Sequence, residues 1–438
     1  MLDAIIDNIT DNSILPICAH EERLHIYYSG KWWQFQTEEE ELFLLIKPLV
    51  KKSINEKRIP AAILNSIHTE LLTFYKELDA YTDIEDAVHI NLKDSIVKIS
   101  KDGEIEEIEH DEEFGFRWQL PFAYDPLAKC PLFEKFLDEV IGEKEAINVL
   151  LEFMGFTLIP HYFKNLEKSL WLIGSGANGK SVLLSVLKDL YGEENTSYLD
   201  LEDLNNEERL TMMSHKLINI SQDASNRLNN SRFKNIVSGG KVITRGLYKS
   251  SSILKAVPKM VIATNQLPVV RDSIDAFLRR IIIIPFNKTI SEQDRDLHLS
   301  DKLKEELAGI FNLALFGLKK ILHNGHFTQS TLISQTIDDY KGELDILGLF
   351  LASNPIKKDY VKGGDFITQV DIFKRVGDFC KETHLRNHYV SPKQIIDKLV
   401  SSYNYARYKN NNIYGIRGAW ETYQNELNTP KNDSEYIK

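Results

Sequence analysis

The segment 174–181 carries the residue types that hold phosphate groups in proteins. Its sequence is Gly174-Ser175-Gly176-Ala177-Asn178-Gly179-Lys180-Ser181, which fits the pattern G-x4-G-K-[ST]. The glycines allow a tight turn whose backbone N–H groups point at phosphate oxygens, and a following helix adds its partial positive charge. In this arrangement the lysine contacts the β- and γ-phosphates, and the serine hydroxyl is a ligand of Mg²⁺. The segment therefore predicts that the chain binds ATP together with Mg²⁺.

Two further polar residues follow short apolar runs downstream of this loop. Asp223 comes after the run 217–220, and Asn265 comes after the run 260–263. A carboxylate at the end of a strand beside a phosphate loop can bind the metal and polarise the attacking water, so Asp223 is the candidate for both roles. The amide of Asn265 is the candidate for contacting the γ-phosphate or the water. For Asp223, an ordinary role in a turn at the end of a strand remains the alternative.

Arg279 and Arg280 stand directly before a fourth apolar run, 281–284. Packing of a buried strand does not require two adjacent arginines. One of them is therefore expected to act as an arginine finger on the ATP of a neighbouring subunit, and Arg280 is favoured because it lies next to the strand. The alternative is that both arginines only pair with surface carboxylates.

The interval 224–271 contains no Asp or Glu and nine basic residues, in a chain whose net charge is −11. Such segregation of charge favours a surface that faces nucleic-acid phosphates. Within it, the sequence predicts a hairpin whose tip carries a tyrosine and a lysine, suited to gripping a single DNA strand by charge and base stacking. The expected DNA-binding residues are Lys241, Arg245, Tyr248, Lys249 and Lys255. A merely solvated loop is the alternative.

The elements that must position these residues alternate between apolar runs and helical stretches. The run 170–173 precedes the phosphate loop and a helix is expected over 182–190, so the core is predicted to be an α/β nucleotide-binding domain with a P-loop. Apolar residues recur at helical spacing over 133–157 and over 299–322, and each range is predicted to form one helix.

After residue 340 the pattern changes to a small C-terminal module. Helices are expected near 366–384 and 391–402, followed by strands at 405–409 and 413–417, which is the outline of a winged-helix domain. Arg407, Lys409 and Arg417 would lie on its wing and contact duplex DNA. The predicted domains are thus a mixed α/β accessory domain over 1–130, a helical collar with the ATPase core over 131–335, the winged-helix-like domain over 336–425, and a flexible tail over 426–438.

The composition sets limits on the class of protein. A length of 438 residues suggests two to four domains, and the acidic balance excludes a wholly basic nucleic-acid coat. Cys18, Cys130 and Cys380 lie far apart, which argues against a disulfide framework or a zinc site. Neither a signal peptide nor a membrane-spanning apolar run is present in the sequence. The expectation is a cytoplasmic protein that does not contact membranes.

Over residues 120–322 the motifs together resemble the superfamily 3 helicases of the phage and plasmid primase-associated type, which are related to the poxvirus primase-helicases. The resemblance rests on Pro121–Pro126, on the loop with Asn178, on Thr264–Pro268 and on Arg279–Arg280 through Phe286. Gln222 stands where many members have a second acid, which leaves open whether another residue acts as the base. Too few residues precede the matched region for the primase domain that many relatives carry.

The resemblance implies an α/β P-loop ATPase core of the AAA+ type. It also implies a ring, expected to be a homo-hexamer, that hydrolyses ATP between subunits and moves 3′→5′ on single-stranded or forked DNA. The implied setting is the replication of a phage, plasmid or other mobile element in a bacterial host, with a separate primase or other replication protein as a further partner. A replication initiator that uses ATP only to melt an origin is the alternative. A P-loop kinase is disfavoured because it does not require the acid-free basic interval.

Overall fold

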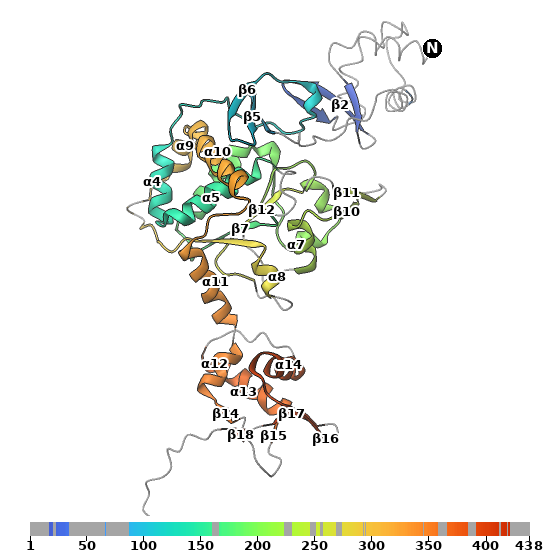
Figure 1. Cartoon of the computed structure of the whole chain (residues 1–438), viewed down its shortest axis with the longest axis vertical. Helices are drawn as coiled ribbons and strands as arrows, with labels where there is room; N and C mark the ends of the chain where they lie inside the picture. The colour runs from blue at the N-terminus through green and yellow to red at the C-terminus, as the bar shows by residue number, and fades with distance from the viewer. Residues whose placement is uncertain are drawn as a thin grey trace, which may run out of the picture. The chain divides into compact units, whose positions relative to one another are not determined.

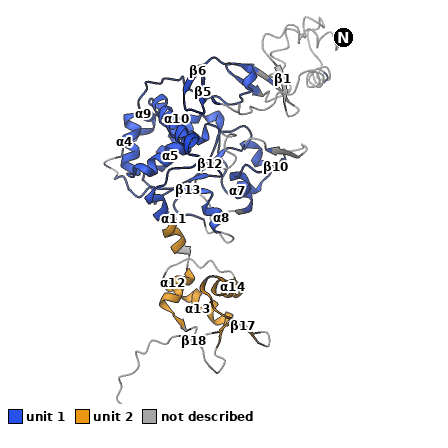
Figure 2. Ribbon diagram, in the orientation of Figure 1, with its two compact units in different colours: residues 1–337 blue, residues 338–438 orange. Residues whose placement is uncertain are grey.

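The chain divides into two compact units, residues 1–337 and 338–438 (Figure 2). The computed structural model describes residues 17–20, 23–34, 66, 87–159, 166–222, 230–245, 251–254, 257–268, 274–291, 293, 295–344, 346–357, 366–383, 391–410, 413–417 and 419–420.

A five-stranded parallel sheet forms the centre of the first unit, in the order β13-β7-β12-β9-β8 (Figure 1). Its strands are β7 Ser169–Ile173, β8 Thr196–Ser197, β9 Ile218–Gln222, β12 Lys259–Thr264 and β13 Ile281–Pro285. Strands covered on both faces are apolar almost throughout, and the residues of β13 are all buried. The strands predicted at 170–173, 217–220, 260–263 and 281–284 all lie in this sheet.

Helices lie around the sheet, and those on one face share an apolar core with it. The helices are α4 Pro131–Val140, α5 Lys144–Thr157, α6 Lys180–Tyr191, α7 Asn230–Val237, α8 Ile274–Leu278, α9 Leu299–Lys304, α10 Leu307–Asn324 and α11 Thr331–Leu344. A hairpin of β10 Val242–Arg245 and β11 Ser251–Leu254 follows α7. It forms a two-stranded sheet of its own.

Both long helices predicted from periodicity are wrong as single helices. The first breaks between α4 and α5, where Gly142 has a left-handed φ of +81°. The second breaks between α9 and α10 at Glu306, whose carboxylate accepts the N–H groups of Leu132 (3.1 Å) and Phe133 (2.9 Å). The break lets Glu306 cap the start of α4, a contact between distant segments that helical spacing does not reveal.

Helices α5 and α10 lie side by side in close contact (Figure 1). A Cβ on Gly155 would lie 2.4 Å from the carbonyl oxygen of Ala314, and one on Gly317 would lie 2.4 Å from that of Leu151. Each helix therefore presents a glycine to the backbone of the other.

Two three-stranded antiparallel sheets precede the helices. One contains β1 Ile17–His20, β2 Arg23–Tyr28 and β3 Lys31–Gln34, and the other contains β4 Ala87–Asn91, β5 Ile96–Ser100 and β6 Ile105–Ile108. Lys31 of the first sheet pairs with Glu194 beside the central sheet, with Nζ and Oε2 2.7 Å apart. This ion pair connects the N-terminal strands to the part of the unit that holds the central sheet.

The second unit contains α12 Ile346–Ser353, β14 Ile356–Lys357, β15 Phe366–Thr368, α13 Gln369–Glu382, α14 Pro392–Tyr403, β16 Arg407–Asn410, β17 Ile413–Arg417 and β18 Ala419–Trp420. The strands form a sheet in the order β15-β17-β16 and a short pair, β14-β18. Helices and sheet enclose a core of their own. Within the described part of the chain, no helix is both long and apolar enough to cross a membrane.

Candidate nucleotide site and nucleic-acid interface

The phosphate loop connects the carboxyl end of β7 to the first turn of α6. Gly176 and Gly179 have left-handed φ angles of +106° and +91°, and Ala177 has a φ of +48°. A Cβ on Gly179 would meet the side chains of Phe136 and Val140 of α4, each at 3.0 Å. The loop thus has the tight turn that the glycine pattern predicts, and α4 packs against its last glycine.

Lys180 is held across this loop. Its Nζ donates to the carbonyl oxygen of Gly174 (2.6 Å) and to Oδ1 of Asn178 (3.2 Å), and only 9% of the residue is exposed. The Nδ2 of Asn178 donates to the carbonyl oxygen of Phe286, 3.0 Å away and just past β13. The amide of Asn178 therefore joins the lysine to β13, a contact that the motif alone did not predict. Ser181 is exposed in the first turn of α6.

Asn265 lies beside the start of the phosphate loop. It follows β12, whose last residue Thr264 is in register with Ile173 at the end of β7. The N–H of Gly174 donates to the carbonyl oxygen of Thr264 over 3.3 Å. Asn265 is exposed. The parallel register therefore brings together the loop and the amide predicted to act with it.

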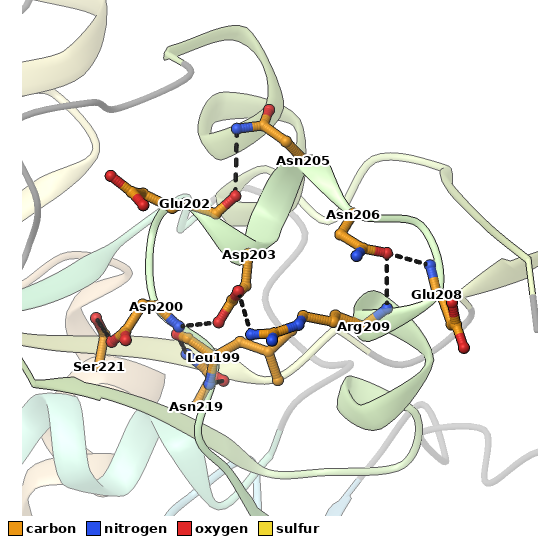
Figure 3. A network of polar contacts seen from close by, with 10 residues as sticks. All are labelled: Leu199, Asp200, Glu202, Asp203, Asn205, Asn206, Glu208, Arg209, Asn219 and Ser221. Carbon is orange, nitrogen blue, oxygen red and sulfur yellow. Dashed lines mark hydrogen bonds and ion pairs between the residues drawn. The ribbon is translucent and has the colours of Figure 1, made fainter.

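The strand preceding Asp223 ends at the same edge of the sheet, because Gln222 of β9 is in register with Ala263 of β12. Asp223 itself lies outside the described residues. A carboxylate that the sequence analysis missed lies beside this strand end, since Ser221 donates its hydroxyl to Asp200 Oδ1 over 3.0 Å (Figure 3). Asp200 follows β8, and the pairing of β8 with β9 puts it there. No spacing motif marks it in the sequence.

Asp200 belongs to a polar network that extends away from the sheet (Figure 3). Its N–H donates to Asp203 (3.1 Å), and Asp203 pairs with Arg209. Asn219 of β9 donates to the carbonyl oxygen of Leu199 and accepts the N–H of the same residue, both over 2.9 Å. These contacts fix the segment after β8 against β9.

Arg279 and Arg280 lie at the opposite, amino edge of the sheet. Strand β13 runs parallel to β7, with Ile281 in register with Ser169 and Pro285 with Ile173. Arg280 is 7% exposed and pairs with Glu167, whose Oε2 is 2.7 Å from its Nη2. Arg279 is exposed. Of the two arginines, Arg279 is therefore the accessible one, whereas Arg280 is engaged within its own chain.

Two lysines at this amino edge are shielded from water. Burial lowers the pKa of Lys168, whose Nζ donates to the carbonyl oxygen of Arg279 over 2.6 Å. Burial also lowers the pKa of Lys259, the first residue of β12, to about 8. The Lys259 ammonium lies over the ring of Phe156, 4.1 Å from its centroid.

The predicted hairpin in the basic interval is confirmed in its two strands, with Val242 in register with Leu254 and Arg245 with Ser251. Lys241 and Arg245 are exposed. Tyr248, Lys249 and Lys255 lie outside the described residues. Arg232 of the same interval lies 3.6 Å from Glu207, so this cation faces a carboxylate of the same unit.

The three cations predicted on the wing of the second unit do not share one surface. Arg407 is in register with Ile416 and Lys409 with Tyr414, so these four side chains share a face. Arg417 alternates with Ile416 and stands on the other face. Arg407 also pairs with Asp397 of α14, and Lys409 lies over the ring of Tyr414. The strand positions predicted that these residues are exposed, but not that Arg417 lies on the opposite face of the sheet from Arg407 and Lys409.

The donor set fits Mg-ATP better than a metal bound by protein alone. Among the described residues, no group of three or more His, Cys, Asp or Glu side chains is placed to hold a metal ion. Mg²⁺ usually takes one or two protein ligands and completes its coordination with phosphate oxygens and water. The phosphate loop, with Lys180 and the exposed Ser181, supplies the groups that a triphosphate with its metal needs.

Comparison with known proteins finds two family matches, neither of which spans half of the chain. Residues 10–142 match a family described as "D5 N terminal like", and residues 172–280 match a "Family of unknown function (DUF5906)". The second match contains the phosphate loop, Asn265 and both arginines.

Relatives in sequence and structure agree with these matches. A candidate helicase of Acanthamoeba polyphaga mimivirus, L207/L206, is 26% identical over an alignment of 247 residues, and the match covers 50% of this chain and 25% of that protein. Solved structures of the NrS-1 C terminal region are similar in fold. One apo structure has a TM-score of 0.51 and 14% identity, and the match covers 95% of this chain and 98% of that chain. The A form of the apo structure has a TM-score of 0.50 and 13% identity, and the match covers 94% of this chain and 98% of that chain. The comparisons relate the chain to D5-like helicases.

Proposed function

We propose that the chain is an ATP-driven DNA helicase of the superfamily 3 type that acts in the replication of a phage, plasmid or other mobile element. The observation that carries the proposal is the placement of the phosphate loop and Asn265 at one edge of a parallel sheet and an exposed arginine at the other. The D5 N terminal like match and the mimivirus relative support the helicase part of the proposal.

In the proposed reaction, the phosphate loop holds the triphosphate of ATP, with Lys180 at its β- and γ-phosphates. The hydroxyl of Ser181 and the carboxylate of Asp223 would hold Mg²⁺, which would offset the phosphate charge. Asp223 also polarises the attacking water, while the amide of Asn265 contacts the γ-phosphate. These roles suit the carboxyl edge of the sheet, where β7, β12 and β9 end side by side.

Arg279 is proposed to act on the ATP of a neighbouring subunit. The strand between the two edges of the sheet has five residues, Ile281–Pro285, and is about 13 Å long at 3.3 Å per residue. An arginine side chain at the amino edge does not span that distance to the nucleotide of its own chain. A ring, with a homo-hexamer as the expected form, would bring Arg279 to the next phosphate loop.

The β10–β11 hairpin is proposed to grip single-stranded DNA, with Lys241, Arg245, Tyr248, Lys249 and Lys255 as its contacts and 3′→5′ movement as the expected direction. Its two strands are antiparallel, and both Lys241 and Arg245 are exposed.

The second unit is proposed to be a winged-helix-like domain that contacts duplex DNA. Its order of elements supports this, because β15, α13, α14 and the β16–β17 hairpin follow one another as in that outline. A separate primase in the cytoplasm of a bacterial host is the proposed partner.

An initiator that melts an origin without processive unwinding shares the same motifs, and strand displacement separates the two functions. The substrate is a fork with a 3′ single-stranded tail and no origin sequence, at about 50 mM salt, where phosphate contacts are strong. Displacement that requires both ATP and the 3′ tail, and that is absent in Lys180→Ala, supports the helicase. DNA-stimulated hydrolysis without displacement favours the initiator. Displacement by Lys180→Ala at the wild-type rate would refute the nucleotide site.

A further inference from the structure

The side chain of Arg280 joins three segments of the first unit. Its Nε donates to the hydroxyl of Ser238 (3.0 Å), its Nη1 donates to the carbonyl oxygen of Ala276 (2.9 Å), and its Nη2 pairs with Glu167 (2.7 Å). The side chain of Arg280 is 9% exposed and that of Glu167 is 34% exposed. The arginine fork thus uses each of its three nitrogens on a different partner, in a site largely shielded from water.

Ser238 stands at the base of the β10–β11 hairpin. It follows α7, and its N–H donates to the carbonyl oxygen of Lys234 over 3.0 Å. The next residue, Gly239, has a left-handed φ of +64°. Asn235 of α7 donates through Nδ2 to the carbonyl oxygen of Lys241 over 3.0 Å, one residue before β10. The chain therefore enters the hairpin from a turn that is held on the last residues of α7.

The same helix is anchored on the strand that precedes the phosphate loop. Trp171 of β7 is fully buried, and its ring meets those of Phe233 of α7 and Phe277 of α8, with centroids 5.9 and 5.5 Å apart. The indole N–H of Trp171 donates to the hydroxyl of Ser169 (3.1 Å), and that hydroxyl donates to the carbonyl oxygen of Arg280 (3.0 Å). Backbone and side chain of Arg280 therefore connect β7 and β13 to the hairpin base.

We propose that Arg280 is a positioning residue that couples the ATPase sheet to the β10–β11 hairpin, so that DNA bound at the hairpin changes the rate of ATP hydrolysis. The inference rests on the proposed function, because it takes the hairpin as the DNA contact. Arg280 itself touches neither DNA nor nucleotide in this role. Its effect passes through Ser238 to the hairpin and through β13 and β7 to the phosphate loop.

Two substitutions remove the link while keeping charge and size. Ser238→Ala removes the acceptor of the Arg280 Nε, and Arg280→Lys keeps a cation for Glu167 but lacks the fork that reaches Ser238. Arg375→Lys is the matched control, because Arg375 also pairs with a carboxylate, Asp371, but on an exposed surface of the second unit. ATP turnover of the full chain is measured against the concentration of a single-stranded thymidine oligonucleotide.

The expected result is a plateau of DNA-stimulated turnover about fivefold lower in Ser238→Ala and in Arg280→Lys, a coupling loss of ordinary size. Turnover without DNA and the half-saturating DNA concentration are expected to stay within about twofold of wild type, by the same coupling argument. The plateau of the double variant is expected to be no lower than that of either single variant, because both substitutions remove the same contact, from the Arg280 Nε to the Ser238 hydroxyl. Wild-type plateaus in both single variants would overturn the inference, and so would a raised half-saturating concentration with an unchanged plateau.

Hydrogen exchange of the β10–β11 amides in the same variants separates this inference from the proposed function. Faster exchange in Ser238→Ala and in Arg280→Lys, but not in Arg375→Lys, supports the positioning role. This holds even if DNA does not stimulate the wild-type chain, a result that would count against the helicase. Unchanged exchange in both variants would overturn the positioning role.

Discussion

Substituting Asn178 by aspartate tests the geometry of the phosphate loop directly. The change keeps the shape of the side chain but replaces its N–H₂ by an oxygen, which faces the carbonyl oxygen of Phe286 that the amide contacts at 3.0 Å. It also places a carboxylate where Oδ1 now lies, 3.2 Å from the Nζ of Lys180. Asn178→Asp is therefore expected to weaken ATP binding by competing with phosphate for the lysine.

The size of the effect follows from the distances. The Nζ lies 3.2 Å from Oδ1 and would contact a phosphate oxygen at about 3 Å; because an ammonium donates along tetrahedral directions, the two oxygens lie about 5 Å apart. At an effective dielectric constant of about 20, two unit negative charges at that distance repel by about 3 kcal/mol. The Kd for ATP is expected to rise about 100- to 300-fold. Separately, loss of the hydrogen bond to the carbonyl oxygen of Phe286 is expected to lower the free energy of unfolding by about 1–2 kcal/mol.

The assay is an equilibrium titration of the full chain with a fluorescent ATP analogue, accompanied by thermal unfolding. Asn206→Asp is the control, because Asn206 is exposed and its Oδ1 already accepts the N–H groups of Glu208 and Arg209. It is expected to bind ATP as the wild type does. A folded Asn178→Asp chain with wild-type affinity would refute the placement of Lys180 against phosphate.

Three further outcomes are expected. Gly155→Ala, whose Cβ would lie 2.4 Å from a backbone oxygen of α10, should destabilise the first unit by about 1–3 kcal/mol in urea unfolding, whereas Gly342→Ala, with open space around it, should not destabilise. The pKa of Lys259 is about 8 in the folded chain and about 10.4 in the unfolded chain. Its charge therefore lowers the free energy of unfolding by the full amount below about pH 8, and this loss fades as the pH rises toward 10.4. Lys259→Met should therefore stabilise by up to about 3 kcal/mol at pH 7 and by much less at pH 10; equal gains at both would contradict the pKa. Arg279→Ala and Lys180→Ala should each be inactive as ATPases, but an equimolar mixture should regain turnover at about a quarter of its interfaces, and no recovery at any ratio would count against action between subunits.

The sequence predicted those parts of the site that depend on neighbouring residues. The strand before the phosphate loop, the glycine turn and the helix after it occupy adjacent positions, so their pattern is visible in one segment. Asn265 was also predicted correctly as a strand-end residue, because the apolar run before it marks β12. The parallel register then brings it beside Gly174.

The features that the sequence did not predict depend on contacts between distant segments. The sequence favoured Arg280 over Arg279 because it lies next to the strand, but only the contacts of Arg280 with Glu167 and Ser238 show that it is held within its own chain. The division of the wing cations follows from the register of β16 and β17. Asp200 is separated from Ser221 by 21 positions, and no motif connects them.

Strand β13 has a consequence for how nucleotide sites would communicate in a ring. One end carries the exposed Arg279, and the other leads to Phe286, whose carbonyl oxygen holds Asn178 in the phosphate loop of the same chain. A subunit that shifts this strand on binding ATP would move the arginine it offers to the next subunit. In the proposed ring, ATP binding at each site would then alter the next site through a single strand, so that neighbouring sites are coupled in one direction around the ring. Hydrolysis would depend on ATP concentration with a Hill coefficient above one.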